Sequence, residues 1–247
     1  MGVLEIRNLS KAFGPVKAIA DVSLTIETGT ITSIVGANGS GKTTLFNIVG
    51  GFLSQDSGTV SYKGHRIDKR RPSQRAAIGI GRLWQDIRVF KNMTVLENLL
   101  VACSNHLGEK ILNCLLRPRD VLAIDKHNLK IAERTLDFIR LSDKRRALAK
   151  DLSYGEQKLL AVGRLLMNDA ELLLLDELTA GVNEVVIVEM LNLIKQLMNH
   201  GKTILMIEHN IPKAISISKN VYVMSEGRLQ PSLDSTDSIL REVYLSA

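Results

Sequence analysis

Apolar and polar residues alternate in two short segments near the start of the chain, residues 3–8 and residues 22–26. A period of two places successive side chains on opposite faces of a strand, one face buried and the other in water. Both segments are therefore predicted to be strands. Their alternation favours an antiparallel edge subdomain.

Farther along the chain, apolar segments without alternation are separated by segments of helical period. Strands that are buried on both faces give near-continuous apolar runs, and the helices between them connect the strands of a parallel sheet. The further predicted strands are residues 31–35, 58–62, 78–83, 172–176, 203–207 and 221–225, and the predicted helices are residues 43–49, 156–167 and 184–199. This pattern predicts an α/β fold with a mainly parallel sheet.

The middle of the chain has a different pattern. Residues 94–141 are mainly helical in period, with an interruption at Pro118. Apolar residues recur there at helical spacing, for example at Leu129, Ala132 and Leu136, while charged residues fill the other face. We therefore expect a helical subdomain inserted into the α/β core.

Composition and charge narrow the class of protein. The 247 residues are 45% hydrophobic and 23% charged, which is ordinary for a globular domain. No apolar run reaches the about 18 residues of a membrane span, and the first residues lack the layout of a signal peptide, so we expect an intracellular protein. The net charge is +6, but only 4% of the residues are aromatic. With little material for base stacking, the basic clusters at residues 69–71 and 144–146 are interpreted as solvated surface, and no nucleic-acid partner is expected.

Residues 36–43 read Gly-Ala-Asn-Gly-Ser-Gly-Lys-Thr, which fits the pattern G-x-x-x-x-G-K-[ST] between a predicted strand and a predicted helix. The glycines let successive backbone N–H groups point at phosphates, and the N-terminus of the following helix favours anions. Lys42 would supply a positive charge to the β- and γ-phosphates, and the Thr43 hydroxyl can ligate Mg²⁺. The alternative, a glycine-rich turn before a helix, is disfavoured by the flanking elements. The segment predicts a nucleotide site.

Two carboxylates, Asp176 and Glu177, follow the apolar residues 172–175. Ligands of parallel sheets bind at the carboxyl ends of the strands, which is where this pair is expected. Asp176 can hold Mg²⁺, directly or through water, and Glu177 can polarise an attacking water.

Residues 152–157 read Leu-Ser-Tyr-Gly-Glu-Gln directly before a predicted helix. In isolation this is a serine-capped helix start with acidic support in its first turn. At its spacing from the carboxylate strand it resembles the LSGGQ signature of the ABC ATPases, with Tyr154 and Glu156 as departures. The resemblance implies that this helix start faces the γ-phosphate of a nucleotide bound to the opposite subunit.

Four further features fit the family in order and spacing. Phe13 stands where an aromatic residue stacks on adenine, and Gln85 matches the glutamine that contacts Mg²⁺ and the attacking water. Residues 180–183 resemble the D-loop, with Asn183 in place of the commoner aspartate. His209 matches the switch histidine that touches the γ-phosphate.

The resemblance covers essentially the whole chain and implies a set of site residues. The implied nucleotide-binding residues are Phe13, Gly36, Asn38, Gly39, Ser40, Gly41, Lys42, Thr43, Thr44, Ser153, Gly155 and Glu156; the implied catalytic residues are Glu177, His209 and Gln85; and the implied Mg²⁺ ligands are Thr43, Gln85 and Asp176. Leu178 departs from the proline that most of the family has after the glutamate. Because proline would fix the backbone, we expect Glu177 to be loosely held, and Leu178→Pro to raise, or at least not to lower, the ATPase rate.

The resemblance also implies an architecture and partners. It implies one ABC ATPase domain over residues 1–247: a P-loop NTPase core of residues 1–87 and 160–247 with a mainly parallel sheet and an antiparallel β edge, and a helical subdomain of about residues 88–159. The implied cofactors are ATP and Mg²⁺. The implied partners are a second ATPase subunit, identical or different, arranged head to tail, and integral membrane subunits. The expected location is cytoplasmic, on the inner face of the cell membrane.

The transporter type is indicated by residues 82–98, which are similar to the R-T-F-Q-x-x-R-L-F-x-x-M-T-V-x-E-N of branched-chain amino acid importers. Tyr154 and the insertion between Asn105 and Lys130 also resemble that subfamily. Urea importers and the lipopolysaccharide-export ATPase share parts of this pattern and are alternatives. A soluble ABC ATPase is a further alternative, although such proteins typically have two cassettes or a long coiled coil. A P-loop kinase or GTPase is another, although it would lack the signature.

Overall fold

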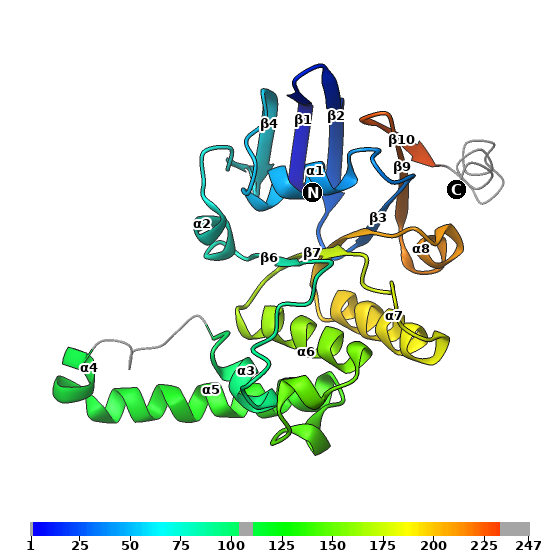
Figure 1. Ribbon diagram of the computed structural model, residues 1–247. Coiled ribbons are helices and arrows are strands. Elements are labelled where there is room, and N and C mark those ends of the chain that lie inside the picture. Colours follow the sequence, from blue (N-terminus) through cyan, green and yellow to red (C-terminus); the bar gives the residue numbers. More distant parts are fainter. Residues whose placement is uncertain (1, 104–110, 233–247) are drawn as a thin grey trace. The chain divides into compact units, whose positions relative to one another are not determined.

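The computed structural model describes residues 2–103 and 111–232, which Figure 1 shows as ribbons. The chain divides into two compact units. The first unit comprises Met1–Gln85, Glu171–Ala180 and Ile187–Ala247, and the second comprises Asp86–Ala170 and Gly181–Val186. No helix in the described parts of the chain is both long and apolar enough to cross a membrane.

An antiparallel sheet opens the first unit. Its strands, in spatial order, are β2 (Val16–Glu27), β1 (Gly2–Phe13), β4 (Ser57–Tyr62) and β5 (His65–Arg66). Both predicted edge strands are present and longer than the alternating pattern indicates. The register of β1 against β2 shifts between Ile6 and Leu9, where Asn8 has a positive φ of 48°, so the period of two is interrupted while the strand continues.

A second sheet of the first unit is mainly parallel, as the apolar runs predict. Its spatial order is β10 (Arg228–Ser232), β9 (Asn220–Ser225), β3 (Ile31–Val35), β8 (Thr203–Ile207), β7 (Leu172–Asp176) and β6 (Ile80–Leu83). Only the pair of β9 and β10 is antiparallel in this sheet. Every residue of the three central strands, β3, β8 and β7, is buried, which explains why their sequences do not alternate.

Helices of the first unit fill the space around these sheets. They are α1 (Lys42–Gly50), α2 (Pro72–Ala76), most of α7 (Glu184–Asn199) and α8 (Ile211–Ile217). Leu45, Phe46 and Ile48 of α1 belong to one hydrophobic core with side chains of both sheets, and Figure 1 shows α1 between the two sheets. This packing fixes the loop between β3 and α1.

The second unit is helical. Its elements are α3 (Val95–Leu100), α4 (Ile111–Leu116), α5 (Pro118–Phe138), α6 (Tyr154–Met167) and two short 3₁₀ turns, η2 (Ser142–Lys144) and η3 (Ala149–Asp151). Helices α3, α5 and α6 pack against one another. Gly163 lets α6 approach its neighbours, because a Cβ at this position would lie 2.8 Å from Ile139 Cδ1 and 3.0 Å from Leu99 Cδ2.

The α/β class, the mainly parallel sheet, the antiparallel strands and the helical region are confirmed. The whole of α6 falls in the second unit, whereas the sequence assigns the chain from residue 160 onward to the core. Helix α6 belongs to the same unit as α3 and α5 because it packs against both of them. Residues 104–110 lie outside the described residues, and they include the first part of the predicted insertion between Asn105 and Lys130.

Candidate active site

The loop between β3 and α1, residues 36–41, is shaped by two glycines, Gly36 and Gly41, at which no side chain fits. Gly36 has a φ of 154°, and a Cβ there would lie 2.2 Å from the carbonyl oxygen of Met224. At Gly41, with a φ of 110°, a Cβ would lie 2.3 Å from the carbonyl oxygen of Ala18. The loop is therefore held tightly against the backbone of β2 and β9, and its curve depends on both glycines.

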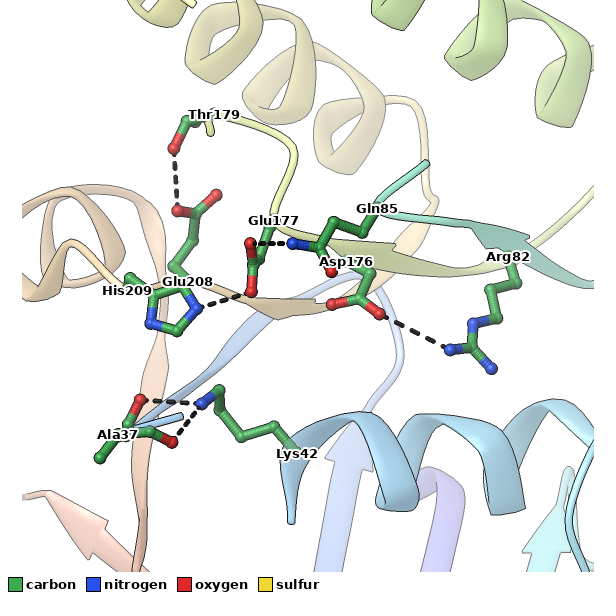
Figure 2. Close-up of polar contacts among 10 residues, drawn as sticks. Ala37, Lys42, Arg82, Gln85, Asp176, Glu177, Thr179, Glu208 and His209 are labelled. Atoms are coloured by element: carbon green, nitrogen blue, oxygen red, sulfur yellow. Dashed lines mark hydrogen bonds and ion pairs between the residues drawn. The ribbon is translucent and has the colours of Figure 1, made fainter. Parts of the chain in front are cut away.

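The side chain of Lys42 lies inside the curve of this loop and binds its backbone. Its Nζ donates hydrogen bonds to the carbonyl oxygens of Gly36 and Ala37, both at 2.8 Å, as Figure 2 shows. Burial lowers the pKa of Lys42, while the charges of Glu177 and Asp176 act in the opposite direction. The ammonium group is thus held within the curl of the loop and within the field of the two carboxylates.

The N-terminus of α1 is open to an anionic ligand. Its N-cap residue is Gly41, which has no side chain to offer the first-turn amides, and the first turn contains no acidic residue. The hydroxyl of Ser40 is buried and has no hydrogen-bond partner among the described residues. Thr43 is exposed and Thr44 is half-buried in the first turn. Uncapped amides, an unpaired hydroxyl and a lysine at a helix N-terminus fit the phosphates of a nucleotide.

The three predicted catalytic side chains meet at one point (Figure 2). Gln85 Nε2 donates to Glu177 Oε2 at 2.9 Å, and His209 Nε2 lies 2.6 Å from Glu177 Oε1 in a second hydrogen bond. Asp176, the last residue of β7, is buried next to this group, and its burial raises its pKa while Arg82 opposes the shift. The structure therefore brings a carboxylate pair, an amide and an imidazole to the carboxyl ends of β6, β7 and β8.

The backbone of Glu177 is fixed, which corrects the expectation that it is loosely held. Glu177 has a φ of 50°, its N–H donates to the carbonyl oxygen of Ile207 at 3.1 Å, and its carbonyl oxygen accepts from Ala180 N at 3.2 Å. Leu178 is only 1% exposed, so an apolar side chain anchors the turn where most of the family has proline.

Sequence reasoning missed a pair that supports this arrangement. Thr179 Oγ1 donates to Glu208 Oε2 at 2.9 Å, and both residues are buried. Thr179 lies two residues after Glu177, and Glu208 immediately precedes His209. The hydrogen bond therefore ties together the two loops that carry the contact between Glu177 and His209. The sequence signal for this pair is Glu208, a charged residue that directly follows the apolar strand β8.

Phe13 ends β1 and is 51% exposed. The Nζ of Lys11 lies 5.7 Å from the centroid of its ring. An exposed aromatic face of this kind is suited to stacking on a planar ligand.

The signature segment belongs to the second unit and is largely satisfied by its own contacts. Ser153 is the N-cap of α6: its Oγ accepts from Glu156 N at 3.3 Å, and Glu156 Oε2 accepts from Ser153 N at 2.9 Å. Glu156 Oε1 accepts from Lys144 Nζ. Burial tends to raise the pKa of Glu156, but the bonds from Lys144 and Ser153 outweigh it, and the pKa is lowered. Gly155 permits close packing, because a Cβ there would lie 2.7 Å from Val186 Cγ1.

Asn183 caps the next helix. Its Oδ1 accepts from Val186 N at 3.0 Å, at the start of α7. An asparagine is as good an N-cap as aspartate, so the departure from the commoner residue leaves this function intact.

The segment after Gln85 is held by a buried asparagine and an arginine. Asn98 is 0% exposed; its Oδ1 accepts from Phe90 N at 2.8 Å, and its Nδ2 donates to the carbonyl oxygens of Phe90 and Thr94, each at 3.0 Å. Arg164 donates to the carbonyl oxygen of Arg88, and its guanidinium carbon lies 4.8 Å from the Phe90 ring centroid. Asn98, which belongs to the importer-like segment of residues 82–98, therefore holds the loop between Phe90 and Thr94 of the same segment.

Known proteins resemble the chain over its whole length. The ABC transporter family model matches residues 19–180. A probable branched-chain amino acid transport ATP-binding protein, LivG, of Archaeoglobus fulgidus is 37% identical over 251 residues, with 100% of this chain and 96% of the relative covered. The high-affinity LivG of Escherichia coli K12 is 34% identical, covering 91% of this chain and 89% of the relative. A crystal structure of an ABC transporter's ATP-binding cassette in its ADP conformation superposes with a TM-score of 0.84 at 32% identity, covering 100% of both chains.

Proposed function

The chain belongs to the ABC transporter family as a subunit that binds and hydrolyses ATP, and from this premise we propose that its transporter imports branched-chain or similar amphipathic amino acids. The observation that carries the cargo proposal is the segment of residues 82–98. Asn98 and Arg164 fix its backbone, and its residue pattern is similar to that of branched-chain amino acid importers. The names of relatives 34% to 37% identical to the chain support the same cargo.

In the proposed reaction the phosphate loop binds the nucleotide and Glu177 orients the water. Lys42 and the amides at the start of α1 interact with the phosphates, and Phe13 stacks on the base. The Glu177 carboxylate accepts a hydrogen bond from the attacking water, which raises the nucleophilicity of that water toward the γ-phosphate. Gln85 and His209, hydrogen-bonded to the same carboxylate, keep it directed into the site.

The same residues fit a divalent cation. Asp176 supplies a buried carboxylate, Thr43 an exposed hydroxyl in the first turn of α1, and Gln85 an amide oxygen, which are oxygen donors of the kind that Mg²⁺ prefers. Bound Mg²⁺ would neutralise charge on the phosphates. We assign these three residues to hold it.

A complete site in our proposal needs two chains. The phosphate loop lies in the first unit and Ser153 in the second, and in the proposed pair Ser153 of one subunit faces the nucleotide held by the other. ATP would then bind the closed pair better than the open one and act as a switch ligand. The membrane subunits would receive this motion through the second unit at the inner face of the membrane.

The test is to reconstitute the chain with its membrane subunits and solute-binding protein and to measure ATPase stimulation by candidate cargoes. Leucine, isoleucine and valine are expected to stimulate the rate. Stimulation by urea alone would select a urea or amide importer instead. Stimulation by lipid-linked substrates without any binding protein would overturn the importer proposal and leave the ATPase assignment standing.

A further inference from the structure

Arg82 is a buried cation next to the site, and sequence reasoning gave it no role. Its side chain is 4% exposed at strand β6. Arg82 Nη1 donates to Asn47 Oδ1 of α1 at 2.7 Å, and Arg82 Nη2 lies 3.6 Å from Asp176 Oδ2 at the end of β7. Figure 2 shows the guanidinium turned toward Asp176. A single side chain thus contacts both the phosphate-loop helix and the carboxylate strand.

An aromatic cluster fixes the plane of this guanidinium. Its central carbon lies 3.9 Å from the Trp84 ring centroid, 5.6 Å from that of Phe52 and 5.9 Å from that of Phe46. Trp84 in turn packs edge-to-face on Phe52, with the centroids 4.6 Å apart. The planar guanidinium of arginine can stack on such rings while its N–H groups donate within its plane, whereas a lysine ammonium is not planar and cannot stack in this way.

The two elements that Arg82 connects bear two proposed Mg²⁺ ligands. Asn47 lies four residues after Thr43 in α1, so both residues lie on the same face of that helix. Asp176 is contacted directly. We propose that Arg82 is a positioning residue that fixes the Asp176 carboxylate relative to the first turn of α1 and so sets the spacing between Asp176 and Thr43. The inference rests on the proposed function, since it needs the metal to bind there.

The experiment compares ATP binding by calorimetry in Mg²⁺ and in EDTA, using the full chain. Partners that orient metal ligands typically contribute about 10- to 100-fold in metal affinity. Arg82→Met is therefore expected to lose about 10- to 100-fold of the gain in ATP affinity that Mg²⁺ gives, while affinity in EDTA stays as in the parent chain. Arg82→Lys is expected to restore only part of it, because it keeps the charge but not the stacking.

A second buried arginine provides the matched control. Arg75 donates to the carbonyl oxygens of Ile48 and Val49, at the other end of α1, and is 1% exposed. Arg75→Met is expected to lower the melting temperature and to keep the Mg²⁺-dependent gain. If it loses that gain as Arg82→Met does, the effect is one of helix stability and the proposal is wrong.

A folded Arg82→Met that keeps the full gain would also overturn the proposal, as would equal losses with and without Mg²⁺. If Arg82→Met does not fold, Asn47→Leu and Asn47→Asp decide, because the first removes the acceptor of Arg82 Nη1 and the second retains one. The gain must fall in the first variant and persist in the second. A parent chain that binds ATP equally with and without Mg²⁺ would instead overturn the metal site itself.

Discussion

Helices α1 and α6 both begin where the sequence predicts contact with phosphate, yet their N-termini are built differently. At α1 the N-cap is Gly41, which leaves the first-turn amides without a side-chain partner. At α6 the N-cap is Ser153, and a capping box with Glu156 satisfies the first turn from within the chain. Lys144 further holds the Glu156 carboxylate.

The difference is that the start of α1 has no side-chain cap of its own, whereas the start of α6 is capped by residues of the same chain. Unsatisfied amides and a hydroxyl without a partner in the described chain cost stability, so the start of α1 gains most when an anion binds. The start of α6 is stable without one, because Ser153 and Glu156 satisfy its first turn. We therefore expect changes around α1 to impair function at little cost in stability, and changes at α6 to cost stability first.

The largest expected effect is that of Glu177→Gln. The amide can keep contacts to Gln85 and His209, but a carboxylate no longer polarises the water, so turnover should fall about 10²- to 10⁴-fold. ATP affinity should be retained, because Lys42 and the loop are unchanged. Turnover is measured as phosphate release by the assembled transporter, and ATP affinity is measured by calorimetry. Glu171→Gln, at an exposed pair with Lys63, is the control and should leave both unchanged.

Lys42→Ala should weaken ATP binding about 10- to 100-fold, since the phosphates lose their main charged side-chain partner. The free energy of unfolding should change much less than the binding free energy. Calorimetry and urea titration on the same preparation compare them, with Lys63→Ala as the surface control. Undiminished ATP affinity in Lys42→Ala would show that the open start of α1 is not the nucleotide site.

The backbone conformation at Glu177 predicts that Leu178→Pro lowers the ATPase rate, whereas the sequence alone predicts a rate that rises or at least does not fall. A residue before proline is driven toward extended conformations, whereas Glu177 has a φ of 50°. Holding Glu177 in this conformation next to a proline costs on the order of 1 kcal/mol or more, and leaving it moves the carboxylate, so the ATPase rate should fall about fivefold or further. Leu178→Met, which keeps the N–H and the apolar volume, should retain the rate. A rate equal to or above that of the parent in the proline variant would show that this strain is not needed.

The smallest effect is expected at the other helix. Ser153→Ala removes the cap of α6 and should cost about 1 kcal/mol in the free energy of unfolding, while Ser153→Thr, which keeps a hydroxyl, should cost less. Denaturant titration of the isolated chain measures this without any partner. If Ser153→Ala is as stable as the parent, the cap does not stabilise α6, and the claimed difference between the starts of α1 and α6 is wrong.

Sequence patterns predicted the parts of the molecule that depend on local periodicity. Strands β3, β7 and β8 and helix α7 have the predicted bounds, because continuous burial or a long helical period gives a clear signal. Helices α2 and α8 were missed because one or two turns are too short to show a period.

Among the candidate site residues, the motifs pointed to Lys42, Glu177 and His209, whereas the sequence did not indicate the residues that support them. Asn47 and Arg82 are 35 residues apart, and Thr179 and Glu208 are 29 apart. Such pairs depend on which strands become neighbours in the sheet, and nothing local to either residue encodes that.

Trp84 has a consequence for how the protein can be observed. It is the only tryptophan in the chain, and its indole lies against the Arg82 guanidinium, which itself contacts Asp176. Indole emission is sensitive to nearby charge, so a shift of that guanidinium would change the fluorescence of one identified chromophore. Stopped-flow mixing with nucleotide could then follow events at the carboxylate strand in real time, in the unlabelled chain.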